Sequence, residues 1–207
     1  IDEEVQCAHK LLHEITPDQP ATDLFLLQYD YHNLKALVKA RLQGKNDAPV
    51  QPGGSMDVEF LQSKVRERDY RSLPKEMQKA LAEVDMLSGG RATPQVIDTI
   101  VDAAMYTDIL QRLEDSDLRG QRRKTPELET YFRARIDLTN IGTLLRARKA
   151  NLPKEIFARL LMPQADITRE QLLSAYDQPL DALGQLLGKG ELRQLVMEGI
   201  EDYIATG

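Results

Sequence analysis

The sequence predicts an all-α protein, and three observations support this. Apolar residues recur at helical spacing along the chain, and no stretch shows the alternation of β-branched residues that is typical of strands. Thr93-Pro94 and Thr125-Pro126 each place a capping hydroxyl before a proline suited to the first helical position. A twelve-residue motif also occurs twice. Within one chain such a match indicates a duplicated structural unit.

The first part of the chain is expected to hold short and long helices separated by turn residues. Thr22 and Ser72 are the predicted N-caps of two of these helices, and Gly89-Gly90 ends the second. Residues 43–56, rich in Gly, Pro and Gln, form the clearest loop. The helices expected before Gly89 span residues 2–14, 22–42, 57–66 and 72–87.

The later part of the chain is expected to begin with two long helices. One follows Thr93, with an apolar stripe at helical spacing, and the other runs from residue 126 to about 149. Shorter helices follow. They start at Pro153, at Thr168 with Gln171 as its capping-box partner, at Pro179 and at about residue 190. We predict a first helical unit over residues 1–92, incomplete at its N-terminus, and a second over 93–207.

The repeated motif pairs residues 30–41 (DYHNLKALVKAR) with residues 137–148 (DLTNIGTLLRAR), at an offset of 137 − 30 = 107. Both copies read D-x-x-N-[LI]-x-x-L-[VL]-[KR]-A-R. On a helix, the shared polar and apolar residues fall on one face, with the carboxylate and the guanidinium about 16 Å apart. The candidate motif residues are Asp30, Asn33, Leu37 and Arg41, and Asp137, Asn140, Leu144 and Arg148.

This face has two possible interpretations. The favoured one is a structural network that fixes helix register, because buried polar groups must be hydrogen-bonded and a duplicated fold keeps its packing residues in every copy. The other is an acid site for general acid/base chemistry or ion binding, which needs convergent partners that no sequence neighbour supplies. We therefore predict no catalytic residue, no cofactor site and no metal site.

Composition excludes several other classes of protein. A formal net charge of −6 argues against a nucleic-acid binder, whose footprint is basic. The single cysteine, Cys7, excludes an intrachain disulfide and fits a reducing cytosol. No run approaches the roughly 18 apolar residues needed to span a bilayer, so a membrane role would be peripheral. Because the chain opens at Ile1 without a Met, we expect upstream residues to be missing.

Three other clusters are interpreted as solvated surface. His9 and His13 have the i, i+4 spacing of a metal pair but lack the H-E-x-x-H pattern. The basic run 119–124 joins two helices, with contact to an acidic partner or to lipid headgroups as the alternative. The acidic residues Glu114, Asp115 and Asp117 fit a helix end, and Gly53-Gly54 matches no nucleotide-binding loop.

Residues 29–44 (YDYHNLKALVKARLQG) and 131–149 (YFRARIDLTNIGTLLRARK) resemble the C subunit of V/A-type ATPases, known as the d subunit in the vacuolar enzyme. The resemblance extends over nearly the whole chain. It implies a funnel-shaped, non-catalytic central-stalk part built from three related helical units. It also implies contact with the D and F subunits of the shaft and with the membrane proteolipid ring, on the cytoplasmic side, without a transmembrane segment of its own.

The resemblance further implies that this part transmits torque between ATP turnover and proton or sodium transport. A third motif copy at the same spacing would begin near residue 244, so we expect a central fragment with about two of three units. A helical adaptor that binds other protein or RNA partners is the alternative function, and an enzyme is the third.

Overall fold

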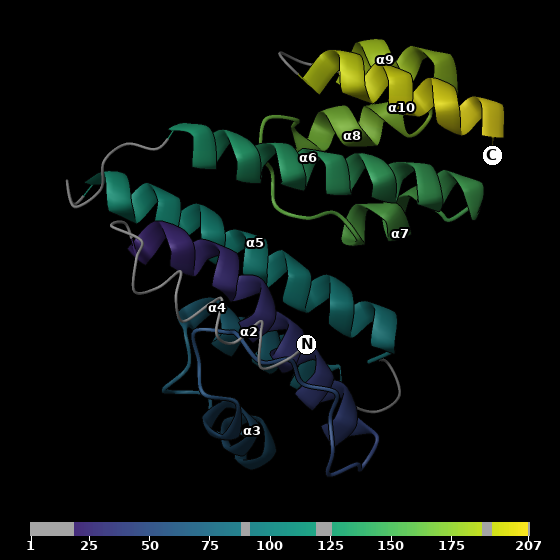
Figure 1. Ribbon diagram of the computed structural model, residues 1–207. Coiled ribbons are helices and arrows are strands. Elements are labelled where there is room, and N and C mark those ends of the chain that lie inside the picture. Colours follow the sequence, from purple (N-terminus) through teal and green to yellow (C-terminus); the bar gives the residue numbers. More distant parts are fainter. Residues whose placement is uncertain (1–18, 88–91, 119–125, 188–191, 207) are drawn as a thin grey trace. The chain divides into compact units, whose positions relative to one another are not determined.

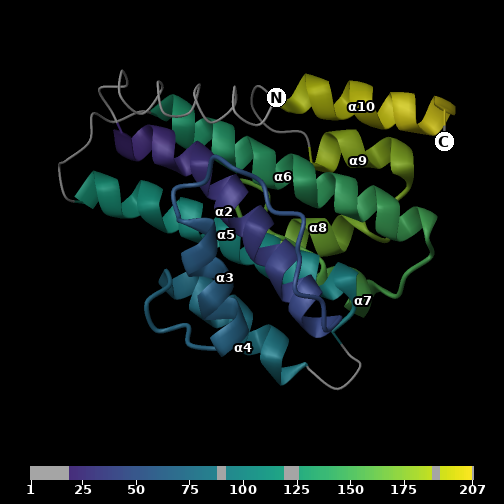
Figure 2. The ribbon, with the colours of Figure 1, turned by 60° about the horizontal axis from the view of Figure 1, so that its bottom comes forward.

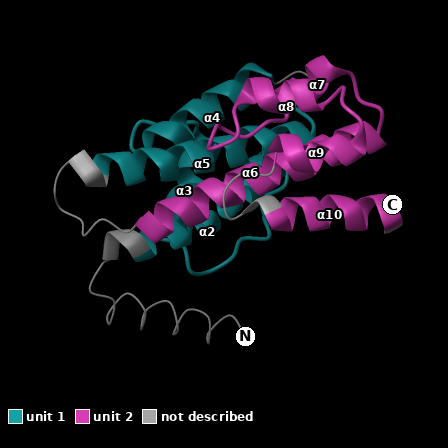
Figure 3. Cartoon of the chain, turned by 90° about the horizontal axis from the view of Figure 1, so that it is seen from above, with its two compact units in different colours: residues 1–125 teal, residues 126–207 magenta. Residues whose placement is uncertain are grey.

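The computed structural model describes residues 19–87, 92–118, 126–187 and 192–206 (Figure 1). All regular secondary structure in these residues is helical, which confirms the predicted all-α class. The chain divides into two compact units, residues 1–125 and 126–207 (Figure 3). The predicted repeat boundary after residue 92 does not coincide with this division, because the helix that follows residue 93 packs within the first unit. The repeat boundary and the funnel shape stay predictions.

The first unit consists of four described helices: α2 (Gln19–Leu42), α3 (Val58–Glu67), α4 (Lys75–Met86) and α5 (Pro94–Leu118). Helix α2 lies beside α5 in both ribbon views (Figures 1 and 2), and α4 also packs on α5. Two ion pairs join α2 to α5, Lys35 to Asp102 at 2.7 Å and Lys39 to Asp98 at 2.5 Å. These contacts hold α5 in the first unit.

The helix starts agree in part with the predicted caps. Thr93 accepts a hydrogen bond from the Val96 N–H at 3.3 Å, as predicted for a capping hydroxyl. Two predicted caps are wrong. Helix α2 begins at Gln19 rather than after Thr22, with Pro20 in its first turn, where a proline is tolerated. Helix α4 begins after Pro74 rather than after Ser72, because Pro74 has an extended ψ of 146°. The predicted cap Thr125 lies outside the described residues.

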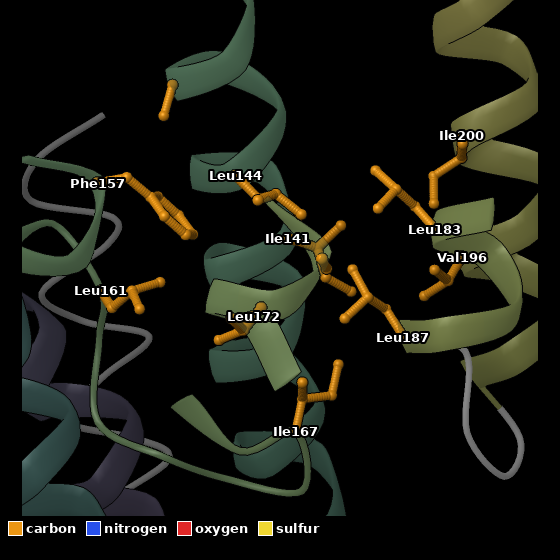
Figure 4. Packing of buried hydrophobic residues seen from close by; sticks show 12 residues of the cluster. Ile141, Leu144, Phe157, Leu161, Ile167, Leu172, Leu183, Leu187, Val196 and Ile200 are labelled. Atoms are coloured by element: carbon orange, nitrogen blue, oxygen red, sulfur yellow. The ribbon is translucent and has the colours of Figure 1, made fainter. Parts of the chain in front are cut away.

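The second unit consists of five described helices: α6 (Pro126–Lys149), α7 (Lys154–Arg159), α8 (Arg169–Ala175), α9 (Leu180–Leu187) and α10 (Leu192–Thr206). The predicted capping box at the start of α8 is confirmed, since Thr168 and Gln171 exchange both of its hydrogen bonds. Ile141 and Leu144 of α6 lie at the centre of a buried cluster (Figure 4). Around them gather Phe157, Leu161, Ile167, Leu172, Leu183, Leu187, Val196 and Ile200.

The two long motif helices end in the same way. Gly44 follows α2 with φ +67°, and Asn151 follows α6 with φ +51°, an offset of 151 − 44 = 107. In each case the next N–H bonds back to the helix, Lys45 to the Ala40 carbonyl and Leu152 to the Ala147 carbonyl, both at 2.9 Å. Glycine and asparagine are the residues that best adopt this left-handed end. The correspondence between the two segments thus continues past the twelve-residue motif.

Candidate functional site

The aspartate and the asparagine of the motif are buried in both copies. Asp30 and Asn33 on α2 are at most 1% exposed, and Asp137 and Asn140 on α6 are at most 2% exposed. A buried polar side chain is costly unless it is hydrogen-bonded. In both copies the partner is the backbone of the loop that follows the motif helix. We call this set of bonds the helix-to-loop clamp.

In the first copy the clamp holds residues 51–56. The Gln51 N–H donates to Asn33 Oδ1 at 2.7 Å, and Asn33 Nδ2 donates to the Gln51 carbonyl at 2.8 Å. Asp30 accepts from the Ser55 N–H at 3.1 Å, the Ser55 hydroxyl at 2.7 Å and the Met56 N–H at 3.0 Å. Five hydrogen bonds therefore fix this loop against α2.

In the second copy the equivalent side chains, Asp137 and Asn140, hold residues 162–167. Asn140 Oδ1 accepts from the Met162 N–H at 2.8 Å. Asp137 accepts from the Asp166 N–H at 3.1 Å and from the Ile167 N–H at 3.2 and 3.3 Å to its two oxygens. The asparagine holds the start of the held segment and the aspartate holds its end, as in the first copy.

The held residues correspond one to one between the copies. Met162 follows Gln51 by 162 − 51 = 111 residues, and Ile167 follows Met56 by the same number. The next residue in each copy is an N-cap, Asp57 for α3 and Thr168 for α8. The offset rises from 107 to 111 because the second loop is four residues longer, and α7 lies within it. The clamp thus sets where the next helix begins.

The motif arginines differ more than the clamp residues do. Arg41 donates to the Val65 carbonyl at 3.0 Å, the Tyr70 hydroxyl at 2.5 Å and Asp85 at 2.5 Å. It therefore joins α2 to α3, to the following loop and to α4. Arg148 donates to the Gln178 carbonyl at 2.6 Å. Arg41 reaches Tyr70, which follows α3, and Arg148 reaches Gln178, which follows α8. Arg41 makes the larger network.

The clamp carboxyl groups are electrostatically unusual. Burial raises the pKa of Asp137 from 3.8 to about 6, although the backbone N–H groups of Ile167 and Asp166 act in the opposite direction. Burial also raises the pKa of Asp30, against the hydrogen bonds from Ser55 and Met56. Desolvation therefore outweighs the donated hydrogen bonds at both positions. The charged form of each carboxyl group is held in the fold at a cost.

The geometry offers the clamp carboxylates little scope for chemistry. Their oxygens are occupied by donors from the loop backbone and Ser55, and Leu37 and Leu144 of the motif lie in the surrounding apolar core. Within the described residues, no three His, Cys, Asp or Glu side chains are grouped so that they could hold a metal ion. Cys7, His9, His13 and the basic run 119–124 lie outside the described residues.

Sequence reasoning missed a second buried network in the first unit. The Tyr31 hydroxyl donates to Asp108 at 2.9 Å, and Arg112 pairs with the same carboxylate at 2.7 Å. Burial and the neighbouring Asp108 raise the pKa of Tyr31. Tyr31 lies inside the motif, but the second copy has Leu138 at that position, so the repeat gave no signal for it.

Gly54 was also missed as part of the site. A Cβ atom added at Gly54 would lie 2.1 Å from Asp30 Oδ1, so only glycine allows the loop backbone this close to the carboxylate. In the sequence, Gly53-Gly54 was compared only with the glycine patterns of nucleotide-binding loops, and it matches none of them. Gly54 lies one residue before Ser55, a clamp donor, and only the folded chain shows this relationship.

A cavity of about 460 Å³ opens beside the C-terminal end of α2. Arg41, Lys45 and Arg66 line it together with Asp47. The Arg41 guanidinium already pairs with Asp85, so one of these three cations is compensated by a carboxylate. No described helix has the length and apolar composition to cross a bilayer.

Comparison with known proteins gives a family match along the chain. A family model described as the ATP synthase (C/AC39) subunit matches residues 2–207. The C subunit of the V-type sodium ATPase of Enterococcus hirae is 26% identical over 192 residues, which cover 92% of this chain and 56% of that protein. The C subunit of the A-type ATP synthase of Thermococcus gammatolerans is 27% identical over 185 residues, which cover 81% of this chain and 46% of that protein.

A third relative gives the same result. The C subunit of the A-type ATP synthase of Methanothermobacter thermautotrophicus is 24% identical over 190 residues, which cover 88% of this chain and 49% of that protein. The chain therefore spans about half the length of the curated relatives it matches. No solved structure matches the chain significantly.

Proposed function

Because the chain belongs to the ATP synthase (C/AC39) subunit family, we propose that it is a connector in the central stalk of a rotary V/A-type ATPase. In this role it links the D and F subunits of the shaft to the membrane proteolipid ring. It transmits torque between ATP turnover and the transport of protons or sodium ions. The single observation that carries this proposal is the family match over residues 2–207.

The helix-to-loop clamp supports a mechanical role. A protein that transmits torque needs loops that do not deform under load. Both clamps fix a loop to a long helix through a buried aspartate and a buried asparagine. Each hydrogen bond contributes about 1 kcal/mol net, but breaking one leaves a buried group unpaired at a cost of about 1–3 kcal/mol. The loop is therefore stiff, because any opening breaks several such bonds together.

The same geometry supports a non-catalytic role. The relatives are named as the C subunit of a V-type sodium ATPase and of A-type ATP synthases. The conspicuous carboxylates of this chain, Asp30 and Asp137, accept hydrogen bonds from their own loops. Catalysis by such a group needs a free position within hydrogen-bond reach of a substrate. We propose that ATP hydrolysis takes place on other subunits and that this protein acts peripherally at the cytoplasmic face of the membrane.

The decisive experiment is binding and reconstitution with the other subunits of the same enzyme. The folded protein is mixed with purified D–F shaft, and complex formation is measured by calorimetry and gel filtration. In parallel, ATP-driven ion uptake is measured in membranes stripped of this connector, before and after the protein is added back. We expect binding to the shaft and, for a protein that spans the full length of the matched relatives, restored uptake without any ATPase activity of the isolated protein.

Two results would overturn the proposal. One is a protein with the helical circular dichroism of the folded state that binds neither the shaft nor the stripped membranes. The other is hydrolytic activity of the isolated protein that is lost when Asp30 and Asp137 are replaced by Asn, with the fold retained.

A further inference from the structure

The cavity beside the C-terminal end of α2 has a filled counterpart in the second unit. It has a volume of about 460 Å³, and its lining residues lie on α2, on α3 and in the loop between them. We call it the α2–α3 pocket. All of its lining residues belong to the first unit, so the pocket is a property of that unit alone.

The residues that correspond to the pocket lining form part of the core of the second unit. The offset between the copies is 152 − 45 = 107 at the end of the motif helix and 168 − 57 = 111 in the helix after the clamp. Five of the lining residues are Leu37, Ala40, Lys45, Gln62 and Val65, and they match Leu144, Ala147, Leu152, Leu173 and Tyr176. All of these counterparts belong to the buried cluster or pack against it. The same place is thus a cavity in one unit and core in the other.

An aromatic ring completes this part of the core in the second unit. Phe157 of α7 is fully buried and extends into the cluster toward α6 (Figure 4). Its ring stacks on that of Tyr176, with the centroids 5.0 Å apart. Helix α7 lies in the longer second loop, whereas the first loop, residues 43–57, contains no helix. The first unit therefore has room for a ring at this place but does not supply one from its own loop.

The α2–α3 pocket is more polar than its counterpart. Lys45 stands where the second unit has Leu152, and Gln62 stands where it has Leu173. Both leucines pack against the buried cluster. In the first unit an ammonium and an amide therefore border a place that aliphatic side chains border in the second. An occupant of the pocket must offer them a polar group, because polar groups that are covered without a hydrogen bond are costly.

The charged groups of the lining leave an excess of positive charge. Arg41, Lys45 and Arg66 contribute cations and Asp47 contributes a carboxylate, and Arg41 is paired with Asp85. Among the described residues, the side chains of Lys45 and Arg66 form no hydrogen bond or ion pair. The carboxylate of Asp47 thus accompanies two unpaired cations. An occupant with one further carboxylate balances the charge and gains charge-assisted hydrogen bonds.

The second unit presents a complementary charge at the same place. Asp177 corresponds to Arg66 at the offset of 177 − 66 = 111, and Lys154 of α7 pairs with it. The helix that carries the buried ring of the second unit thus also brings a cation to this position. Because Arg66 replaces Asp177 in the first unit, the sign is reversed there, and the complementary group is an anion.

We propose that the α2–α3 pocket binds a small organic carboxylate that carries an aromatic ring. The ring lies on the apolar lining from α2 and α3, as Phe157 lies among the counterparts of those residues. The carboxylate is held by Lys45 and Arg66. A volume of about 460 Å³ is within the range of about 300–1,000 Å³ that is usual for small-molecule sites. The inference goes beyond the proposed function and does not depend on it.

Two probes of the same shape test the pocket. Phenylpropionate and its neutral amide, phenylpropanamide, are titrated at neutral pH into the isotope-labelled protein, and the backbone N–H signals are followed by NMR. We expect saturable shifts of residues 44–47 and 62–66 with the acid, at a Kd on the order of 1 mM for a ligand of this size. The amide should bind at least about fivefold more weakly because it lacks the charge. Absence of saturable shifts at these residues, shifts confined to other residues, or equal binding of the amide would overturn the site.

Matched substitutions test how the carboxylate is held. Lys45→Leu installs the residue of the second unit, and Arg66→Gln removes the other cation. Lys75→Gln removes the same charge from α4, outside the lining, and is the control. All three side chains are exposed, so the melting temperature of each variant should stay close to that of the parent.

The two probes then report on charge and shape separately. Lys45→Leu and Arg66→Gln should each weaken binding of the acid about fivefold or more and leave the affinity for the amide within about twofold, whereas Lys75→Gln should change neither. Acid binding that is unaffected by both pocket substitutions, or that Lys75→Gln weakens as much, would refute the assignment. The proposed function would stand in that case, because the family match does not involve the pocket.

Discussion

Asn33 and Gln51 exchange two hydrogen bonds, so the side-chain amide of Asn33 pairs with the backbone of Gln51 as another peptide group would. Asn140 makes only half of this arrangement. It accepts from the Met162 N–H, while its Nδ2 is buried without a hydrogen-bond partner among the described residues. The two copies thus keep the same residue type but satisfy it to different degrees.

This difference predicts unequal costs of truncation. Asn33→Ala leaves both the N–H and the carbonyl of Gln51 without their partner, and we expect it to lower the free energy of unfolding by about 2–3 kcal/mol. Asn140→Ala removes one bond together with an unpaired donor, so about 1 kcal/mol is expected. Urea unfolding followed by circular dichroism measures both. Equal losses, or a larger loss at Asn140, would contradict the assignment.

The clamp aspartate of the second unit provides a test of the structural interpretation itself. Asp137→Ala leaves the N–H groups of Asp166 and Ile167 unpaired, at about 1–3 kcal/mol for each buried group. We expect a lower melting temperature and no loss of any chemical activity. The exposed Leu138→Ala is the matched control on the same helix. An Asp137→Ala protein that melts like the parent and loses a catalytic activity would show that the carboxylate has a chemical role.

Gly54 of the first clamp is predicted not to tolerate a side chain. In Gly54→Ala the new methyl group would overlap Asp30 Oδ1, so the loop must move and the clamp bonds lengthen. Overpacking of this kind costs about 1–3 kcal/mol. Gly199→Ala is the control. Gly199 lies in α10 with no atom within 4 Å of the added carbon, so this change should stabilise by about 0.5–1 kcal/mol. Thermal unfolding of the two variants decides the sign of each effect.

The arginine network predicts a difference between the two copies for a conservative change. Arg41→Lys keeps the charge, but one ammonium group cannot reach the Val65 carbonyl, Tyr70 and Asp85 at the same time. We expect a loss of about 2 kcal/mol in unfolding free energy. Arg148→Lys loses one bond to the Gln178 carbonyl at an exposed position, and about 0.5 kcal/mol is expected. A larger effect at Arg148 would contradict the assigned roles.

Much of the helical order could be predicted from the sequence because local signals fix helix ends. Thr93 and Thr168 cap helices through bonds to residues three positions on, so their chemistry is visible in a short window. Ser72 misled the prediction because Pro74, with its extended ψ, is the residue after which the helix begins, and Thr22 misled it because α2 already includes the residues before Thr22. A capping residue is therefore informative only when the backbone after it can be helical.

The clamp could be located from the sequence, but its partners could not. The repeated spacing of Asp, Asn and Arg showed that these side chains share one helix face. The groups they contact lie 18 to 30 residues further on and are mostly backbone N–H groups, which carry no sequence signature. The second copy also has a loop four residues longer, so a fixed offset fails there. Only the folded chain shows that residues 51 and 162 are equivalent.

The raised pKa of Asp137 predicts a pH dependence of stability. Burial raises this pKa from 3.8 to about 6. Between these values the folded state holds the proton more tightly than the unfolded state, so the unfolding free energy falls as the pH rises from about 4 to about 6 and then levels off. At about 1.4 kcal/mol per pKa unit, the change is on the order of 3 kcal/mol.

The Asp137→Asn variant isolates this contribution, because asparagine keeps an acceptor oxygen for the Ile167 N–H but does not titrate. The unfolding free energy of the parent minus that of the variant should therefore decrease across this pH window, which cancels the titration of the other groups. Carbon NMR of the Asp137 carboxyl group should show its midpoint near pH 6. A midpoint below 4, or a difference that rises with pH, would mean that the loop N–H groups outweigh burial and that the charged form is the one this fold stabilises.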